Sequence, residues 1–385
     1  RVAILAALLA LALPREGAAQ RVVPRGTAVT PPAGDAPSLD PMSDGRAVSA
    51  PKTAKRVSPM FAPIPMKNTQ LGWGLMLMAG VIHRFDADTT IKPSTGAVMG
   101  LASENGSWGT MAIEVARFNG DAWRVRGMIG YMDIRYDFYG IGIDAGEAGR
   151  SVPLEQTFFP AALVVLRRVA GPLYLGGSIF RGETTIELRD SVPGLPVPDQ
   201  ARAVLLAPGV QVEYDTRDND YWPERGSLAE AKGRFFSTSS GESGNFQRYT
   251  LSWSWYNGLR GRDLVLVTNV NACAAPGDAP FYGLCTLGFG RYTMRGYTQG
   301  RYRDHFGNVV QAELRGHRGR FGGVAFAGFG QVAEKASDIT KAVLLPAGGL
   351  GARYQLTAKY PMPLRLDYAW GRDGGLLYFS VGEAF

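Results

Sequence analysis

Residue types suited to catalysis are scarce in this chain of 385 residues. Its three histidines are His83, His305 and His317. No Gly-x-Ser-x-Gly turn, His-Glu-x-x-His pair or phosphate-cradling glycine loop accompanies them. The sequence therefore predicts a protein that is not an enzyme and that holds no cofactor and no metal.

Acidic residues gather at one turn, where Asp215, Asp218 and Asp220 lie close together in the sequence. Carboxylates grouped in this way could serve an active site, but a water-exposed turn explains them better. We expect the exposed turn. Asp304 and His305 are likewise expected to be polar surface residues.

A basic and aromatic stretch, RYTMRGYTQGRYRD, runs from Arg291 to Asp304. Basic side chains interleaved with aromatic ones often bind nucleic acid. The net charge of +7 is modest for such a protein, and no other nucleic-acid signal is present. We therefore expect no nucleic-acid partner, whereas a small positive charge favours anionic lipid headgroups.

Two cysteines, Cys273 and Cys285, stand 12 residues apart without a histidine nearby. Such a pair makes a poor zinc site. In an oxidising compartment it can form a disulfide across a loop. We expect that disulfide.

The N-terminus begins with an unbroken apolar run from Val2 to Leu13, and small residues follow at 17–19. The run is shorter than the roughly 20 residues of a membrane-spanning helix. Residues 1–20 are therefore expected to be a signal peptide. Residues 21–56 are rich in proline and are expected to be a disordered periplasmic leader, or else a tail that docks a partner.

From Val57 onward, apolar and polar residues alternate in strand-sized segments. In YTLSWSWY, Trp253 and Trp255 share one face and Ser252 and Ser254 the other. The polar faces carry charges toward the middle of long segments, and the apolar faces carry Trp and Tyr near the ends. This pattern is typical of a transmembrane barrel with its apolar side toward lipid.

Sixteen such segments can be counted, an even number like that of most bacterial single-chain barrels, and strands of roughly 9–11 residues fit the length of the chain. The predicted fold is therefore all-β, a 16-stranded antiparallel transmembrane barrel over residues 57–385. The strands are expected near 57–67, 72–85, 94–105, 109–118, 122–138, 156–169, 173–189, 203–217, 227–238, 246–257, 263–273, 306–318, 321–334, 346–359, 363–371 and 375–385.

The first strand contains Pro59, Pro63 and Pro65, all at odd positions. Proline cannot donate a ladder hydrogen bond, so these positions must be directed away from the hairpin partner. We therefore expect a weak seam where the first strand meets the last, formed by Pro59, Pro63, Pro65, Gly382 and Phe385. The alternative is a proline-rich lead-in to the barrel without further meaning.

The last strand reads GLLYFSVGEAF, with Gly382 three residues before the terminal Phe385. Alternation predicts that Leu377, Phe379, Val381 and Phe385 share one face. A terminal aromatic residue on such a strand resembles the assembly signal of outer-membrane barrels.

Four stretches resemble the BamA/TamA family of outer-membrane assembly proteins, also called bacterial surface antigens. MRGY (294–297) is similar to the family's VRGY or VRGF motif, and YDTRDNDYWPERGS (214–227) to its strand and turn ending in F-P-x-x-G. YDFYGIG (136–142) and the closing YFSVGEAF (378–385) also resemble family segments. The resemblance implies a protein of the bacterial outer membrane that takes part in membrane assembly.

In this family a long sixth outer loop folds into the lumen and places an arginine against the inner wall. Carried over, the resemblance implies a loop lock formed by Met294, Arg295, Gly296 and Tyr297, with Glu313 as the acidic partner of the arginine. A buried arginine needs such a partner, because an unpaired buried charge is costly.

Two features depart from the family pattern. Gly328 stands where the family often has a second acid, so we expect the loop to be held less firmly. Residues 21–56 are too few for a POTRA domain, so the chain resembles a POTRA-less member.

The resemblance implies insertion or translocation of proteins or lipids through the seam between the first and last strands. Expected partners are outer-membrane lipids, client barrel proteins and partner lipoproteins. A passive outer-membrane channel, or a structural barrel that anchors a partner, is the alternative.

Overall fold

The structure, a computed structural model, describes residues 57–86, 91–189, 200–220, 222–239, 245–260, 264–288, 294–355 and 363–385. The predicted signal peptide and leader lie outside these residues, and so does Arg291.

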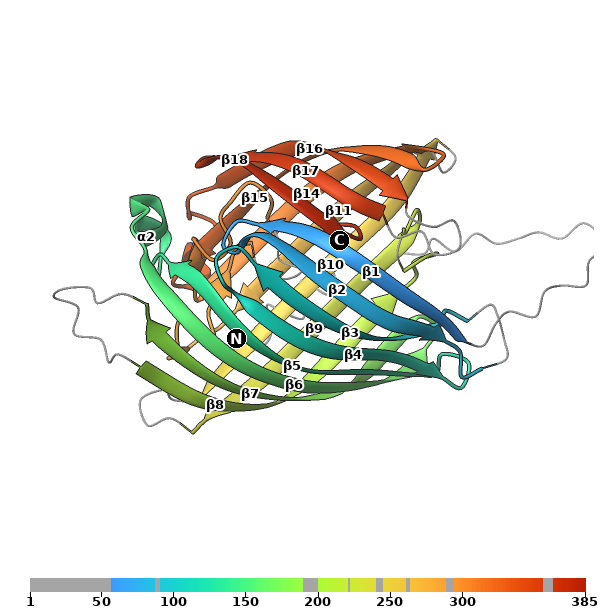
Figure 1. Cartoon of the computed structure of the whole chain (residues 1–385), viewed down its shortest axis with the longest axis horizontal. Coiled ribbons are helices and arrows are strands. Elements are labelled where there is room, and N and C mark those ends of the chain that lie inside the picture. Colours follow the sequence, from blue (N-terminus) through green and yellow to red (C-terminus); the bar gives the residue numbers. More distant parts are fainter. Residues whose placement is uncertain are drawn as a thin grey trace, which may run out of the picture. The chain divides into compact units, whose positions relative to one another are not determined.

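Sixteen strands close into one antiparallel barrel (Figure 1), which confirms the predicted fold. Chain neighbours pair throughout, except that β14 pairs with β11 because the short pair β12 and β13 lies in the loop between them. The strands are β1 (Val57–Asn68), β2 (Gly72–His83), β3 (Ser94–Ser103), β4 (Trp108–Phe118), β5 (Trp123–Phe138), β6 (Val152–Ala170), β7 (Leu173–Leu188), β8 (Gln200–Asp215), β9 (Gly226–Thr238), β10 (Phe246–Arg260), β11 (Leu264–Ala274), β12 (Cys285–Thr286), β13 (Arg303–Asp304), β14 (Phe306–Arg318), β15 (Phe321–Ala333), β16 (Leu345–Gln355), β17 (Pro363–Gly371) and β18 (Gly374–Val381).

Ten of the sixteen barrel strands are longer than the expected 9–11 residues, and four consecutive ones, β5–β8, are the longest. β5, β7 and β8 have 16 residues each and β6 has 19, so the expectation of 9–11 residues is wrong here. The extra residues continue the ladder past the apolar band. On their outward face Arg135 of β5 and Glu155 of β6 form an ion pair of 3.1 Å. Because an outward-facing ion pair is stable in water rather than in lipid, this part of the two strands lies outside the apolar band.

Two short helices lie in loops of the described part of the chain. α2 (Ile143–Ala148) lies between β5 and β6, and the 3-10 helix η2 (Ala336–Asp338) lies between β15 and β16. Neither described helix is long or apolar enough to cross a membrane.

The outward faces of the strands expose large apolar side chains, as the alternation predicts. Trp73, Trp108, Trp123 and Trp370 lie exposed near strand ends. This apolar surface with aromatic residues at its borders is the lipid-facing surface of a transmembrane barrel. Exposed aliphatic side chains between them include Leu77, Val98, Ile129, Leu163, Ile179, Val210, Leu314, Leu350 and Leu366.

The inner wall of the barrel has two chemically different halves among the described residues. On β8–β17 it carries buried polar and charged side chains, including Gln211, Glu213, Glu230, Asn269, Asn271, Gln311, Glu313, Arg315, Arg353 and Asp367. On β1–β5 it carries methionines, together with the ion-paired Arg117 of β4 and Arg124 and Arg126 of β5. Eight of the chain's 11 methionines lie on this inner face, namely Met60, Met66, Met76, Met78, Met99, Met111, Met128 and Met132.

Candidate functional site

The loop between β11 and β14 folds into the barrel. Among its described residues, Met294, Tyr297 and Tyr302 are buried and pack with Val309 of β14 and Leu345 of β16. The loop therefore fills part of the lumen, as the resemblance implied.

A disulfide fixes the first part of this loop. Cys273, at the end of β11, is bonded to Cys285 of β12, with their Cα atoms 5.7 Å apart. β12 pairs in turn with β13, so the bond ties the loop to the barrel wall just before the buried tip.

Arg295 lies between two buried carboxylates. Its Nη2 donates to Glu313 Oε2 at 2.5 Å, the partner that the resemblance implied, and its Nη1 donates to Asp367 Oδ2 at 2.8 Å. The guanidinium also lies 3.4 Å from the ring centroid of Phe326, a favourable cation–π position. One arginine thus ties the loop to β14, β15 and β17.

Asp367 was not predicted as a site residue. The expectation of a loosely held loop assumed that the second acid stood at 328, yet β17 supplies one instead. Gly328 has no room for a side chain, because a Cβ there would lie 2.3 Å from the carbonyl oxygen of Val310. In LRLDYAW (364–370), apolar Leu366 and Tyr368 alternate with Arg365 and Asp367, and this alternation was the available signal that Asp367 faces inward.

The Arg295 site is the centre of a larger buried network. Arg315 donates to Glu313 at 2.6 Å, and Arg353 donates to Asp367 at 2.5 Å and to Glu383 at 3.0 Å. Because each charge has an opposite partner within reach, the network compensates for the cost of removing these groups from water.

The residues beside Arg295 approach the wall closely. Gly296 has a φ of 100°, and a Cβ on it would lie 2.9 Å from Ala347 Cβ and from the Trp370 carbonyl oxygen. Tyr297 donates its hydroxyl hydrogen to the Pro346 carbonyl at 2.7 Å. Only glycine fits at this contact.

The end of the chain does not follow the predicted face. β18 stops at Val381, and Gly382, with a φ of 88°, turns the chain away from the strand. Phe385 packs against Tyr256, Val265 and Val267 on the inner wall. The prediction that Phe385 shares a face with Leu377, Phe379 and Val381 is therefore wrong, because the positive φ ends the alternation.

The barrel closes where β1 meets β18. Among the described residues these strands share one pair, Lys67 with Phe379, whereas β1 pairs with β2 from Val57 to Asn68. Pro59, Pro63 and Pro65 are fully paired in register with β2, at Val81, Leu77 and Leu75. Among the described residues, β1 therefore shares a much shorter ladder with β18 than with β2.

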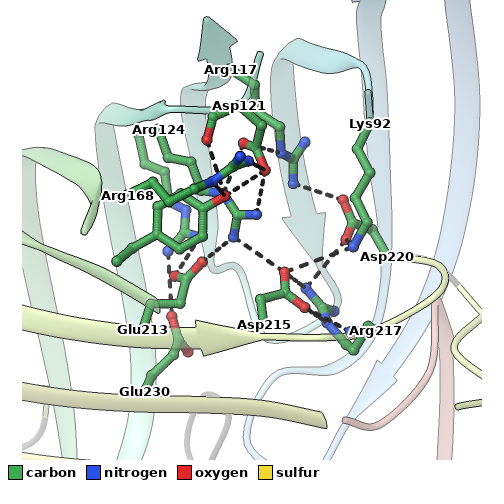
Figure 2. Close-up of polar contacts among 12 residues, drawn as sticks. Lys92, Arg117, Asp121, Arg124, Arg168, Glu213, Asp215, Arg217, Asp220 and Glu230 are labelled. Atoms are coloured by element: carbon green, nitrogen blue, oxygen red, sulfur yellow. Dashed lines mark hydrogen bonds and ion pairs between the residues drawn. The ribbon is translucent and has the colours of Figure 1, made fainter. Parts of the chain in front are cut away.

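Figure 2 shows a second ion-pair network, which joins side chains of β4, β5, β8 and β9 to residues before β3 and after β8. Asp220 pairs with Lys92 at 2.8 Å and with Arg117 at 2.7 Å, and Asp215 pairs with Arg217 at 3.0 Å. The expectation of a water-exposed turn is wrong for Asp215 and Asp220. Asp215 and Asp220 instead contact Lys92, just before β3, and Asp220 also contacts Arg117 of β4, so cations cover both carboxylates.

Two turn carboxylates show the electrostatic effect of this packing. Burial raises the pKa of Asp220, but the charges of Arg117, Lys92 and Arg217 outweigh it and hold the pKa below the ordinary 3.8. Burial likewise opposes ionisation of Asp121, but bonds and charge from Arg124 lower its pKa overall.

Asp304 is also buried, contrary to the expectation of a surface residue. It belongs to β13, and its carboxylate accepts the backbone N–H of His305 at 2.8 Å. Burial raises the pKa of Asp304 above its ordinary value. Nearby, Arg301 pairs with Asp373 at 3.2 Å, and buried Arg303 donates to the Gly300 carbonyl.

Comparison with known proteins agrees with this geometry. Residues 203–385 match the model of the Omp85 superfamily domain. These residues are an Omp85 domain. They include the loop, both of its acidic partners and the closing strand, so the features that resembled the BamA/TamA family lie within the matched part. No curated protein matches the chain at a significant level.

Solved structures with a similar fold extend the likeness over the Omp85 domain and the strands before it. BamA from Haemophilus ducreyi lacking POTRA domains 1–3 has a TM-score of 0.58 and 14% identity, with 85% of this chain and 70% of that chain covered. CdiB from Acinetobacter baumannii has a TM-score of 0.58 and 15% identity, and CdiB from Escherichia coli has 0.56 and 12%. The chain spans 60% and 62% of these two CdiB chains, with 85% of its own length covered in both.

The lipid-facing surface, the closed barrel and the Omp85 domain together make this a barrel of the bacterial outer membrane. No cluster of three or more potential metal-ligating side chains occurs within the described ranges.

Proposed function

We propose that this barrel acts in the insertion or translocation of proteins at the outer membrane and that the β1–β18 closure is the place where a client leaves the lumen. The short ladder at Lys67 and Phe379 carries the proposal, because few backbone hydrogen bonds must break for these strands to separate. The Omp85 domain and the fold shared with BamA and CdiB support it.

We further propose that the loop holds this closure in place. Gly296 donates its N–H to the Tyr378 hydroxyl at 3.0 Å, and that hydroxyl lies 3.3 Å from the Tyr297 carbonyl. Tyr378 belongs to β18, the strand that would move. Separation of the seam therefore requires β18 to give up its contacts with the loop that Arg295 anchors.

The test is a covalent tether across the seam. The double variant Lys67→Cys/Phe379→Cys places two thiols at paired positions on β1 and β18. The matched control, Tyr368→Cys/Leu377→Cys, tethers β17 to β18 at another paired position. Both proteins are reconstituted in liposomes, oxidised, and tested for acceleration of the folding of an unfolded outer-membrane barrel.

We expect the seam tether to abolish acceleration and the control tether to preserve it, with reductant restoring activity to the first. Equal activity in both oxidised proteins would refute a lateral exit. Large steady conductance in single-channel recordings, unchanged by the seam tether, would support a passive channel instead. We also propose that partner lipoproteins take part if the folding of the client requires their addition to the liposomes.

A further inference from the structure

The methionine half of the inner wall lines a chamber beside the closure. The chamber has a volume of about 650 Å³, and Ile64, Met66, Met76, Met78 and Met99 form its apolar side. All of these methionines are half-buried, so they present surface to the chamber. Rows such as Met78, Met99 and Met111 are continuous from strand to strand.

The opposite side of the chamber is polar. Ser252, Ser254 and Asn269 line it, together with Arg365 of β17 and with Arg217, Asp220 and Glu383, which have cation or carboxylate partners of their own. Arg365 has weak contacts in comparison with its neighbours: its Nη2 lies 3.3 Å from Ser380 Oγ, and its Nε lies 3.7 Å from Asp367 Oδ2. Asp367 already receives shorter hydrogen bonds from Arg295 and Arg353. Of the two arginines that line the chamber, Arg217 and Arg365, Arg365 is therefore the one with more to gain from an anionic ligand.

The chamber opens sideways toward the membrane. Lys67 and Phe379 line it although the alternation places both on the outward face, next to exposed Trp73 and Leu366. Side chains of the outer surface can line an inner chamber only where the wall between them is incomplete. That place is the closure between β1 and β18, which lie beside each other in Figure 1.

The size and chemistry of the chamber distinguish between two kinds of occupant, a small amphiphile and a polypeptide strand. Pockets of about 300–1,000 Å³ with an apolar lining and a few polar groups suit a small amphiphile. A polypeptide strand would need the edge of β1 for pairing, but Pro59, Pro63 and Pro65 remove three N–H donors from that strand. Methionine adapts its shape to flexible apolar chains without specific pairing.

We propose that this chamber binds the acyl chain of an anionic membrane lipid, which enters sideways through the closure and places its charged group near Arg365. The site goes beyond the proposed handling of proteins, since it needs no client and is defined by the chamber alone.

The experiment uses the whole protein in nanodiscs of phosphatidylcholine with a small fraction of phosphatidylglycerol whose acyl chain carries a diazirine. After irradiation, adducts are assigned to single residues by mass spectrometry. β2 supplies an internal control, because Leu75 and Leu77 face bulk lipid while Met76 and Met78 face the chamber. We expect adducts at both sets of residues.

Three further arms separate the outcomes. The same diazirine chain on phosphatidylcholine should label Met76 and Met78 roughly tenfold less, and Arg365→Gln should reduce labelling by phosphatidylglycerol to that level. Met78→Gln should lower the inner adducts and leave those at Leu75 and Leu77 unchanged. Labelling of the wild-type protein stands as a test even if a variant does not fold.

Adducts confined to Leu75 and Leu77 in the wild-type protein would overturn the proposal. So would labelling of the methionines by a diazirine-bearing amphipathic strand peptide but not by lipid. Because no client is present in the lipid arms, their result is independent of whether the seam tether stops assisted folding.

Discussion

Arg295 at the tip of the lumenal loop lies 2.8 Å from Asp367 on β17, and the carboxylate of Asp367 is fully buried. The two residues are 72 positions apart in the chain. Their ion pair joins the loop to a strand next to the barrel closure, so the loop is fixed on two sides rather than by Glu313 alone.

Replacement of Arg295 by alanine should destabilise the barrel strongly. It leaves the buried carboxylates of Glu313 and Asp367 each short of one partner, and a broken buried pair typically costs about 3–5 kcal/mol. The change in unfolding free energy is measured by urea unfolding, with the folded fraction monitored by the heat-dependent shift of the barrel in electrophoresis. The matched control is Arg372→Ala, whose pair with Glu147 is exposed and should contribute less than about 1 kcal/mol. Equal effects of the two variants would contradict the loop lock.

Asp367→Asn and Glu313→Gln should not act independently. Both carboxylates bind Arg295 and both also contact Arg353, so removal of one weakens the same network as removal of the other. We expect the loss of unfolding free energy in the double variant to be smaller than the sum of the single losses by about 0.5–3 kcal/mol. Additive losses would show two separate sites.

Gly296→Ala should be more damaging than Gly374→Ala. Both glycines have a positive φ, 100° and 112°, so both variants suffer the strain of that backbone conformation. Only at Gly296 would the new methyl group meet Ala347 and the Trp370 carbonyl, whereas no atom lies within 4 Å at Gly374. The difference between the two losses, about 1–3 kcal/mol, reports overpacking at the loop tip. Limited proteolysis of the loop should show the same order.

Acid should weaken the network of Figure 2. The pKa of Asp220 is lower in the folded protein than its ordinary 3.8, so its contribution to stability is fully present above 3.8 and is lost as the pH falls through the folded value. In Asp220→Asn, the urea concentration at the unfolding midpoint should therefore fall less steeply with decreasing pH in this acid range. Glu147→Gln, at an exposed pair, should keep the wild-type slope. A wild-type slope in Asp220→Asn would contradict the role of Asp220.

Strand number and facing were predictable because a barrel wall obeys a period of two. Gln311, Glu313 and Arg315 face the lumen as their alternation requires, and Leu314 faces lipid. The pairing of Arg295 with Glu313 was accessible through the resemblance to a known motif. These features depend on local pattern, which a single sequence carries.

Contacts across the lumen were not predictable in the same way. Asp367 meets Arg295, and Asp220 meets Lys92 and Arg117, only because the barrel closes and its turns bend inward. The inward turn at Gly382 is a matter of one dihedral angle, and alternation beyond it gives the wrong face for Phe385.

The eight methionines of the inner wall also make the lumen sensitive to oxidants. A thioether that gains one oxygen becomes a polar, chiral sulfoxide, and reductases can reverse the change. Successive oxidation would convert the apolar half of the lumen into a polar one without any substitution. The interior of the barrel would then be polar on both sides, as in a water-filled pore. Its affinity for apolar ligands would depend on how far oxidants in the cell envelope had oxidised the methionines.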